Sequence, residues 1–167
     1  MTNNLSTTIT RLFSISLFLL VTAGLSIAQE TASGNGLPHK LVGTWDSVVT
    51  IRNCATGDAI RSFQSVGSFN EGGTFSGITS GTPPTARTSE RGIWEQVRGR
   101  NYRFRFKAYL YNPEAVAIGF QIVTHDVRLS RNGESYVSAG TTQIFTLDGV
   151  EIGSGCSTAE STRMVID

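Results

Sequence analysis

The side chains that most often do chemistry are sparse in this chain, and they do not form a familiar constellation. The sequence contains two histidines and two cysteines. His125 falls within a predicted strand, and its neighbour Asp126 points to the opposite face, so the two do not form a catalytic dyad. No serine lies in a Gly-X-Ser-X-Gly elbow, and no carboxylate pair stands out for glycoside hydrolysis. We therefore assign no catalytic residue and favour a protein that is not an enzyme, with enzymatic activity left open.

Metal and redox chemistry are not indicated either. A zinc site needs more ligands than two cysteines and two distant histidines supply, so we expect no metal and no cofactor. Cys54 and Cys156 lack the Cys-X-X-Cys spacing of redox motifs. An even cysteine count in an oxidising compartment favours a disulfide, with free thiols as the alternative.

The N-terminal residues have the layout of a secretory signal peptide. Arg11 precedes an apolar run over 12–25, and Ser26-Ile27-Ala28 has small residues where signal peptidase reads. A run of this length falls short of the ~20 residues that span a bilayer, so no stable membrane anchor is expected. The prediction is a signal peptide over 1–28, a flexible leader over 29–39 and a folded domain over 40–167. The protein would then be secreted, into the periplasm or the medium.

The predicted mature chain carries no net charge. Cleavage after residue 28 removes one basic residue of 14 and no acidic residue of 13, which leaves 13 of each. A neutral domain lacks the basic face that nucleic-acid binding requires. Its length fits one domain that buries its own core.

Alternating apolar and polar residues, separated by Gly, Asn and Pro turns, indicate eight strands. The Asn70–Gly73 turn, the Asn132-Gly133 pair and the Pro83-Pro84 segment are the clearest turn and loop signals. The last predicted strand allows a break near 153–155. The predicted strands span 42–52, 60–70, 74–79, 91–97, 102–111, 117–130, 135–146 and 151–164.

The connections between these strands are too short for parallel crossovers. The sequence therefore predicts an all-β fold, an eight-stranded antiparallel up-and-down barrel that closes and leaves no free edge. A barrel of eight strands is either filled by its own side chains or holds one small ligand.

Gly43-X-Trp45 on the first strand, the eight-strand meander and Arg163 on the last strand resemble the lipocalin and wider calycin group. The resemblance implies that Trp45 lies across one end of the barrel with the Arg163 guanidinium over its ring, both in structural roles with Gly43. The acidic turn and the C-terminal helix of lipocalins are not recognisable. The length fits avidin-like barrels better, but their biotin-binding pattern is absent, so no ligand residue carries over.

Closure of the barrel makes a further prediction about the cysteines. In a closed meander the first and last strands are antiparallel neighbours. Cys54 lies nine positions after Trp45, and Cys156 lies seven positions before Arg163. One register therefore brings the Trp–Arg contact and a Cys54–Cys156 disulfide together.

The leading functional hypothesis is a secreted barrel that binds a small apolar or amphipathic molecule. Its candidate ligand-binding residues are aromatic or titratable side chains of the predicted inner faces. The phenylalanine rings are most simply core, Trp94 is either core or pocket wall, and His125 is most simply a satisfied or partly exposed histidine. These candidates are Phe63, Phe69, Trp94, Phe104, Phe106 and His125.

Two other functions remain open. Cationic side chains crowd one turn and one outward strand face, over Arg98, Arg100, Arg103, Arg105 and Lys107. This is either a solvated face or a surface for an anionic partner, which would make the domain an interaction or adhesion module. An isomerase-like or cyclase-like enzyme would instead need a buried pocket group with a shifted pKa, such as Glu95 or His125.

Overall fold

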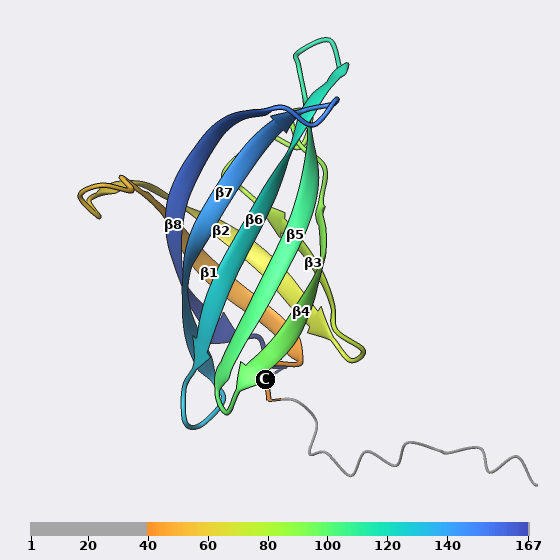
Figure 1. The fold of residues 1–167 in the computed structure, drawn as a ribbon. Helices are drawn as coiled ribbons and strands as arrows, with labels where there is room; N and C mark the ends of the chain where they lie inside the picture. The colour runs from red at the N-terminus through yellow and green to blue at the C-terminus, as the bar shows by residue number, and fades with distance from the viewer. Residues whose placement is uncertain (1–39, 167) are drawn as a thin grey trace, which may run out of the picture. The chain divides into compact units, whose positions relative to one another are not determined.

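The computed structural model describes residues 40–166, so the predicted signal peptide and leader lie outside the described residues. The described chain is all-β, and its eight strands close into one antiparallel barrel in simple sequence order (Figure 1). The strands are β1 (Gly43–Arg52), β2 (Ala59–Asn70), β3 (Thr74–Thr79), β4 (Glu90–Arg98), β5 (Asn101–Tyr111), β6 (Ala117–Leu129), β7 (Ser135–Thr146) and β8 (Glu151–Arg163).

The predicted barrel is confirmed, and β3 and β7 have the predicted bounds. The other strands differ from their predicted ends by only a residue or so. The break allowed near 153–155 does not occur, since β8 is continuous. An irregularity does lie beside this segment: Ile144 pairs with Gly153 and Phe145 pairs with Glu151, so the extra residue Ile152 forms a bulge in β8. Within residues 40–166 there is no helix long and apolar enough to cross a membrane.

Pairing of β1 with β8 closes the barrel in the predicted register. Trp45 lies opposite Arg163, and Arg52 lies opposite Cys156. Cys54 therefore falls two positions beyond the last pair, in the turn that follows β1. The turn brings it back to β8, and the Cys54–Cys156 disulfide forms with a Cα–Cα distance of 5.2 Å. The predicted disulfide is confirmed.

The two halves of the barrel are packed differently. We call the half where β1, β3, β5 and β7 begin the closed half, and the half where they end the open half. The closed half is filled by large side chains that pack edge to face around Phe69, which is 1% exposed. Its buried side chains are Leu41, Trp45, Phe69, Phe75, Trp94, Tyr102, Val127, Leu129 and Tyr136.

Trp45 and Arg163 seal the base of the closed half. The Arg163 guanidinium carbon lies 4.3 Å from the Trp45 ring centroid, and the indole Nε1 donates to the Leu41 carbonyl at 2.9 Å. Arg163 also donates to the Val42 carbonyl at 2.8 Å. Gly43 has a φ of 137°, and a Cβ there would lie 2.5 Å from Arg163 Nη1. The Gly-X-Trp motif is thus explained locally, because only glycine leaves room for the guanidinium.

The loop between β3 and β4 runs beside β5 at the open half. The Thr88 amide donates to the Tyr109 carbonyl at 3.0 Å, and Arg87 forms an isolated bridge with Leu110. Earlier in the loop, a Cβ on Gly81 would lie only 2.7 Å from the Phe63 ring, so the chain passes directly over that ring. The loop thereby brings the Arg87 side chain to the barrel interior.

Candidate functional site

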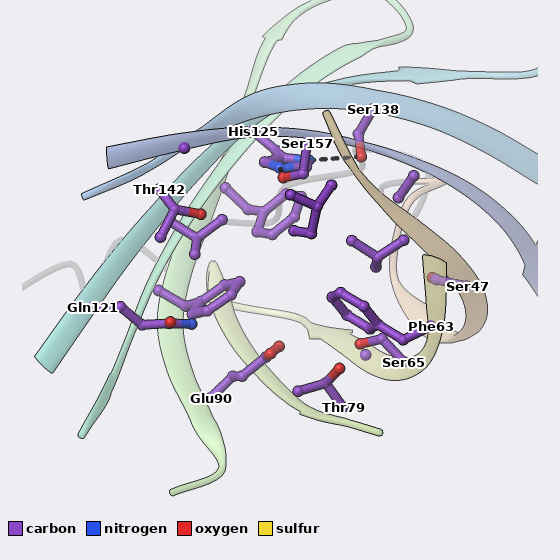
Figure 2. A pocket seen from close by; sticks show the side chains of 18 of the residues that line it. Ser47, Phe63, Ser65, Thr79, Glu90, Gln121, His125, Ser138, Thr142 and Ser157 are labelled. Atoms are coloured by element: carbon purple, nitrogen blue, oxygen red, sulfur yellow. Dashed lines mark hydrogen bonds between the residues drawn. The ribbon is translucent and has the colours of Figure 1, made fainter. Parts of the chain in front are cut away.

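A cavity of about 300 Å³ occupies the open half of the barrel. Its wall combines apolar rings with polar side chains that converge from several strands (Figure 2). The size is at the lower end of ordinary ligand sites, which run from about 300 to 1,000 Å³. The cavity therefore meets the volume requirement of the ligand-binding hypothesis, and the closed half forms its floor.

Four of the six candidate ligand-binding residues line this cavity: Phe63, Phe104, Phe106 and His125. The other two, Phe69 and Trp94, do not line it and belong to the packed closed half. Alternation along a strand shows which side chains point inward, but it does not show their height along the barrel axis. That height depends on the stagger between strands, which is a property of the closed barrel.

The most ordered polar group in the wall is a histidine between two serines. His125 Nδ1 lies 2.9 Å from Ser138 Oγ, and Nε2 lies 2.9 Å from Ser157 Oγ (Figure 2). The histidine comes from β6, while the serines come from β7 and β8. All three side chains are buried. We call these three residues the Ser–His–Ser group.

Gly140 makes this arrangement possible. It lies on β7 directly opposite His125 on β6, and Ser157 is its partner on β8. A Cβ on Gly140 would lie 2.4 Å from the imidazole Cδ2 and 1.9 Å from the Thr124 carbonyl oxygen. The missing side chain lets the imidazole lie across β7 and reach the next strand.

Burial holds His125 in its neutral form. Loss of hydration lowers its pKa from 6.5 to about 4, and this outweighs the opposite effect of Asp126. Asp126 points outward and pairs with Arg103 at 2.7 Å, which agrees with its predicted orientation. At neutral pH the imidazole therefore has one N–H, which donates to one serine hydroxyl. Its other ring nitrogen accepts from the second serine hydroxyl.

A second polar group lies elsewhere in the cavity wall. Arg87 Nη2 donates to Glu90 Oε1 at 2.8 Å, and both side chains are buried. With its amide oxygen turned toward Arg87, Gln121 accepts from Nε at 3.0 Å and from Nη2 at 2.7 Å. Burial raises the pKa of Glu90, although its ion pair with Arg87 lowers it in part. The two charges neutralise each other within the wall.

Glu90 was missed at the sequence level, and Glu95 was named in its place. Glu95 is exposed on the outside of the barrel. The signal was available, because Trp94 is an inward residue of the same strand and every second position from it points inward. This parity assigns Glu90 to the interior and Glu95 to the exterior. The Glu95 prediction was wrong because it did not follow this parity, and Glu90 was missed because the predicted strand begins one residue too late, at 91.

Hydroxyl groups form the floor of the cavity. Ser47 and Ser161 share a hydrogen bond of 2.7 Å between their Oγ atoms. Tyr136 hydrogen-bonds to both serines, and burial raises its pKa. These three hydroxyls satisfy one another, and Ser47 and Tyr136 line the cavity where it meets the closed half.

The cationic face does not behave as a single free patch. The Arg103 side chain is exposed and pairs with Asp126, while Arg100 donates to the Leu129 carbonyl at 3.1 Å. The Lys107 ammonium lies 3.7 Å from the Phe120 ring centroid, so it packs against an aromatic neighbour. Arg98 and Arg105 are exposed. An anionic partner for this face stays a prediction.

Comparison with known proteins adds little. No protein-family model matches the chain, and no curated protein matches it. Among solved structures it is similar to the crystal structure of Rv2717c from M. tuberculosis, with 13% sequence identity, a TM-score of 0.38, and coverage of 75% of this chain and 94% of that chain. A likeness this distant carries no argument about function.

Proposed function

We propose that this protein is secreted, to the periplasm or the medium, and that it binds a small amphipathic molecule inside the open half of its barrel. The observation that carries the proposal is the cavity of about 300 Å³, which combines aromatic walls with a few buried polar groups. This combination is typical of small-molecule sites, where apolar walls supply affinity and a few polar groups fix orientation.

The disulfide and the apolar N-terminal segment support the location. Cys54 and Cys156 are joined, and structural disulfides persist mainly in oxidising compartments. The bridge also lies at the open half, where it ties the β1–β2 turn to β8. A binding site whose rim must stay in place benefits from this covalent link.

The experiment is an extraction of the natively secreted protein, with mass spectrometry of the small molecules that accompany it. The matched variant is Gly155→Phe. Gly155 lines the cavity, and a Cβ there meets nothing within 4 Å, so the added ring occupies open space. The control is Thr141→Phe, which places the same ring on the exposed outer face of β7.

We expect one small-molecule species at close to one equivalent in the wild type and in Thr141→Phe, and its loss in Gly155→Phe. A molecule retained equally by all three proteins would be bound elsewhere and would contradict the proposal. Far-UV circular dichroism should show that both variants keep the barrel of the wild type.

A further inference from the structure

We propose that the Ser–His–Ser group is the ligand-anchoring part of the cavity, and that it takes an uncharged oxygen, as in an alcohol or a ketone. This inference rests on the proposed function and specifies the chemistry of the ligand. It is drawn from the hydrogen-bond valences of Ser138, His125 and Ser157 and from the charges around them.

The three side chains satisfy one another only in part. One serine accepts the imidazole N–H and keeps its own O–H, while the other donates to the bare ring nitrogen and keeps its lone pairs. Across residues 40–166, each serine hydroxyl has His125 as its one side-chain partner. Both serines line the cavity. The group therefore retains one serine that can still donate and one serine that can only accept at the cavity wall.

The donor and the acceptor are interchangeable. Because both ring nitrogens have a hydroxyl at 2.9 Å, moving the imidazole proton from one nitrogen to the other reverses the roles of the two serines. A ketone oxygen needs only a donor, and an alcohol needs a donor and an acceptor. The group meets either requirement without moving a heavy atom.

The charges of the wall disfavour an ionised ligand group. Arg87 is neutralised by Glu90 at 2.8 Å. At the mouth, Arg61 is exposed, donates to the Gly81 carbonyl at 3.1 Å and lies over the Phe63 ring. A carboxylate beside the Ser–His–Ser group would lose its hydration without meeting a free cation there, which is costly. An uncharged oxygen loses far less hydration free energy on burial than a carboxylate does.

The surroundings of the group also indicate the body of the ligand. The Phe104 ring centroid lies 5.5 Å from that of His125, and Phe106, Val123 and Val49 line the same cavity. An apolar cavity of roughly 150 Å³ holds benzene. A cavity of about 300 Å³ then suits a body of about two fused rings.

The same geometry argues against a nucleophilic serine. Activated serines have a base that is itself oriented by a third group, usually a carboxylate that stabilises the imidazolium. Here the third group is another hydroxyl, and Asp126 faces the opposite side of the sheet. His125 is therefore a poor base, and the serines act as hydrogen-bonding groups.

The test is calorimetric titration with naphthalene, naphthol, tetralone and naphthoate, which share one bicyclic shape. We expect naphthol and tetralone to bind about tenfold more tightly than naphthalene, the gain of about one hydrogen bond. We expect naphthoate to bind more weakly than either, because its carboxylate loses hydration without meeting a free cation. In the double variant Ser138→Ala, Ser157→Ala, naphthol and tetralone should weaken about tenfold while naphthalene is unchanged. In Thr142→Val, which removes a different cavity hydroxyl, naphthol and tetralone should weaken less than in the double variant.

If the double variant does not fold, Ser138→Ala and Ser157→Ala alone test the same expectation, each with about a threefold loss. Naphthoate binding tightest would show that Arg61 anchors a carboxylate, and would overturn the inference. An equal loss of naphthol and naphthalene, or a larger loss in Thr142→Val, would also overturn it. Naphthalene binding without any preference for oxygen would leave the proposed function standing. Binding of none of the four probes would overturn both.

Discussion

The closed and open halves of this barrel use the same strands for different purposes. In the closed half, inward positions carry Trp45, Phe69 and Tyr136, which leave no room for another molecule. In the open half, the inward positions of the same strands include Ser65, Thr142 and Gly155, which leave a cavity. The difference is one of side-chain volume and not of backbone. The closed sheet encloses both halves, and side-chain size decides whether an interior region is packed core or cavity.

The two halves also differ in how far the sequence predicts them, because alternation gives the inward side chains but not the half in which each one lies. Alternation correctly placed Phe104 and Phe106 inside the barrel, and the turn residues located nearly every strand end. It could not distinguish Phe63, at the cavity, from Phe69, in the packed half, because both have the same parity on β2. They lie about 20 Å apart along β2, and alternation does not show which of these two levels of the barrel is filled by side chains.

Side-chain contacts that reach across an intervening strand could not be predicted from the sequence either. His125 reaches Ser157 over Gly140, and this requires knowing that the three residues lie side by side on β6, β7 and β8. Arg87 comes from the loop before β4 and enters the interior beside β5. Neither feature leaves a local pattern. The Trp45–Arg163 contact was anticipated only through a resemblance.

The largest expected effect is in the closed half. Trp45→Ala should lower the free energy of unfolding by about 3–5 kcal/mol, because it removes a fully buried ring and the surface on which Arg163 packs. Phe63→Ala, in the partly exposed cavity wall, should cost only about 1 kcal/mol. Urea denaturation followed by circular dichroism measures both. Equal losses would mean that the two halves are equally packed, contrary to the structure.

Removing the disulfide tests the rim of the open half. Cys54→Ser with Cys156→Ser should cost about 2–5 kcal/mol, since the bridge closes a loop with a sequence separation of 102. Both tryptophans of the chain lie in the closed half, so intrinsic tryptophan emission reports on that half alone. Below the unfolding transition, the emission should stay native in the variant. A red-shifted emission in dilute buffer would show that the closed half depends on the rim.

Acid should destabilise the barrel through its neutral histidine. The folded pKa of His125 is about 4, against 6.5 in the unfolded chain, so the unfolded state binds more protons between these values. The contribution of His125 to the free energy of unfolding is therefore fully present above pH 6.5. It is lost as the pH falls toward 4, by about 3 kcal/mol in total. Glu90 has a raised pKa and acts in the opposite direction as it protonates.

The variant His125→Gln isolates the histidine from Glu90 and from all other groups. The difference in stability between wild type and His125→Gln should shrink as the pH falls from 6.5 to 4. Urea denaturation at a series of pH values measures it. A difference that does not change with pH would show that His125 is not held neutral by burial.

The smallest effect is expected on the outer face. Arg103→Ala should leave the unfolding midpoint unchanged, since its ion pair with Asp126 is exposed and such pairs contribute little. The unfolding midpoint of Arg103→Ala should also change with salt concentration in the same way as that of the wild type. A clear loss of stability would show that the outer face matters to the fold, and would weaken the division between interior site and solvated exterior.

The central claim is that the open half, and only the open half, takes a ligand. The most direct measurement is nuclear magnetic resonance of the protein with bound naphthol, following intermolecular contacts to assigned methyl groups. The account predicts contacts to Val49, Val123 and Ile144, which line the cavity, and none to Leu41 or Leu129 in the closed half. Contacts confined to exposed methyl groups such as those of Ile93, or no saturable binding at all, would contradict it.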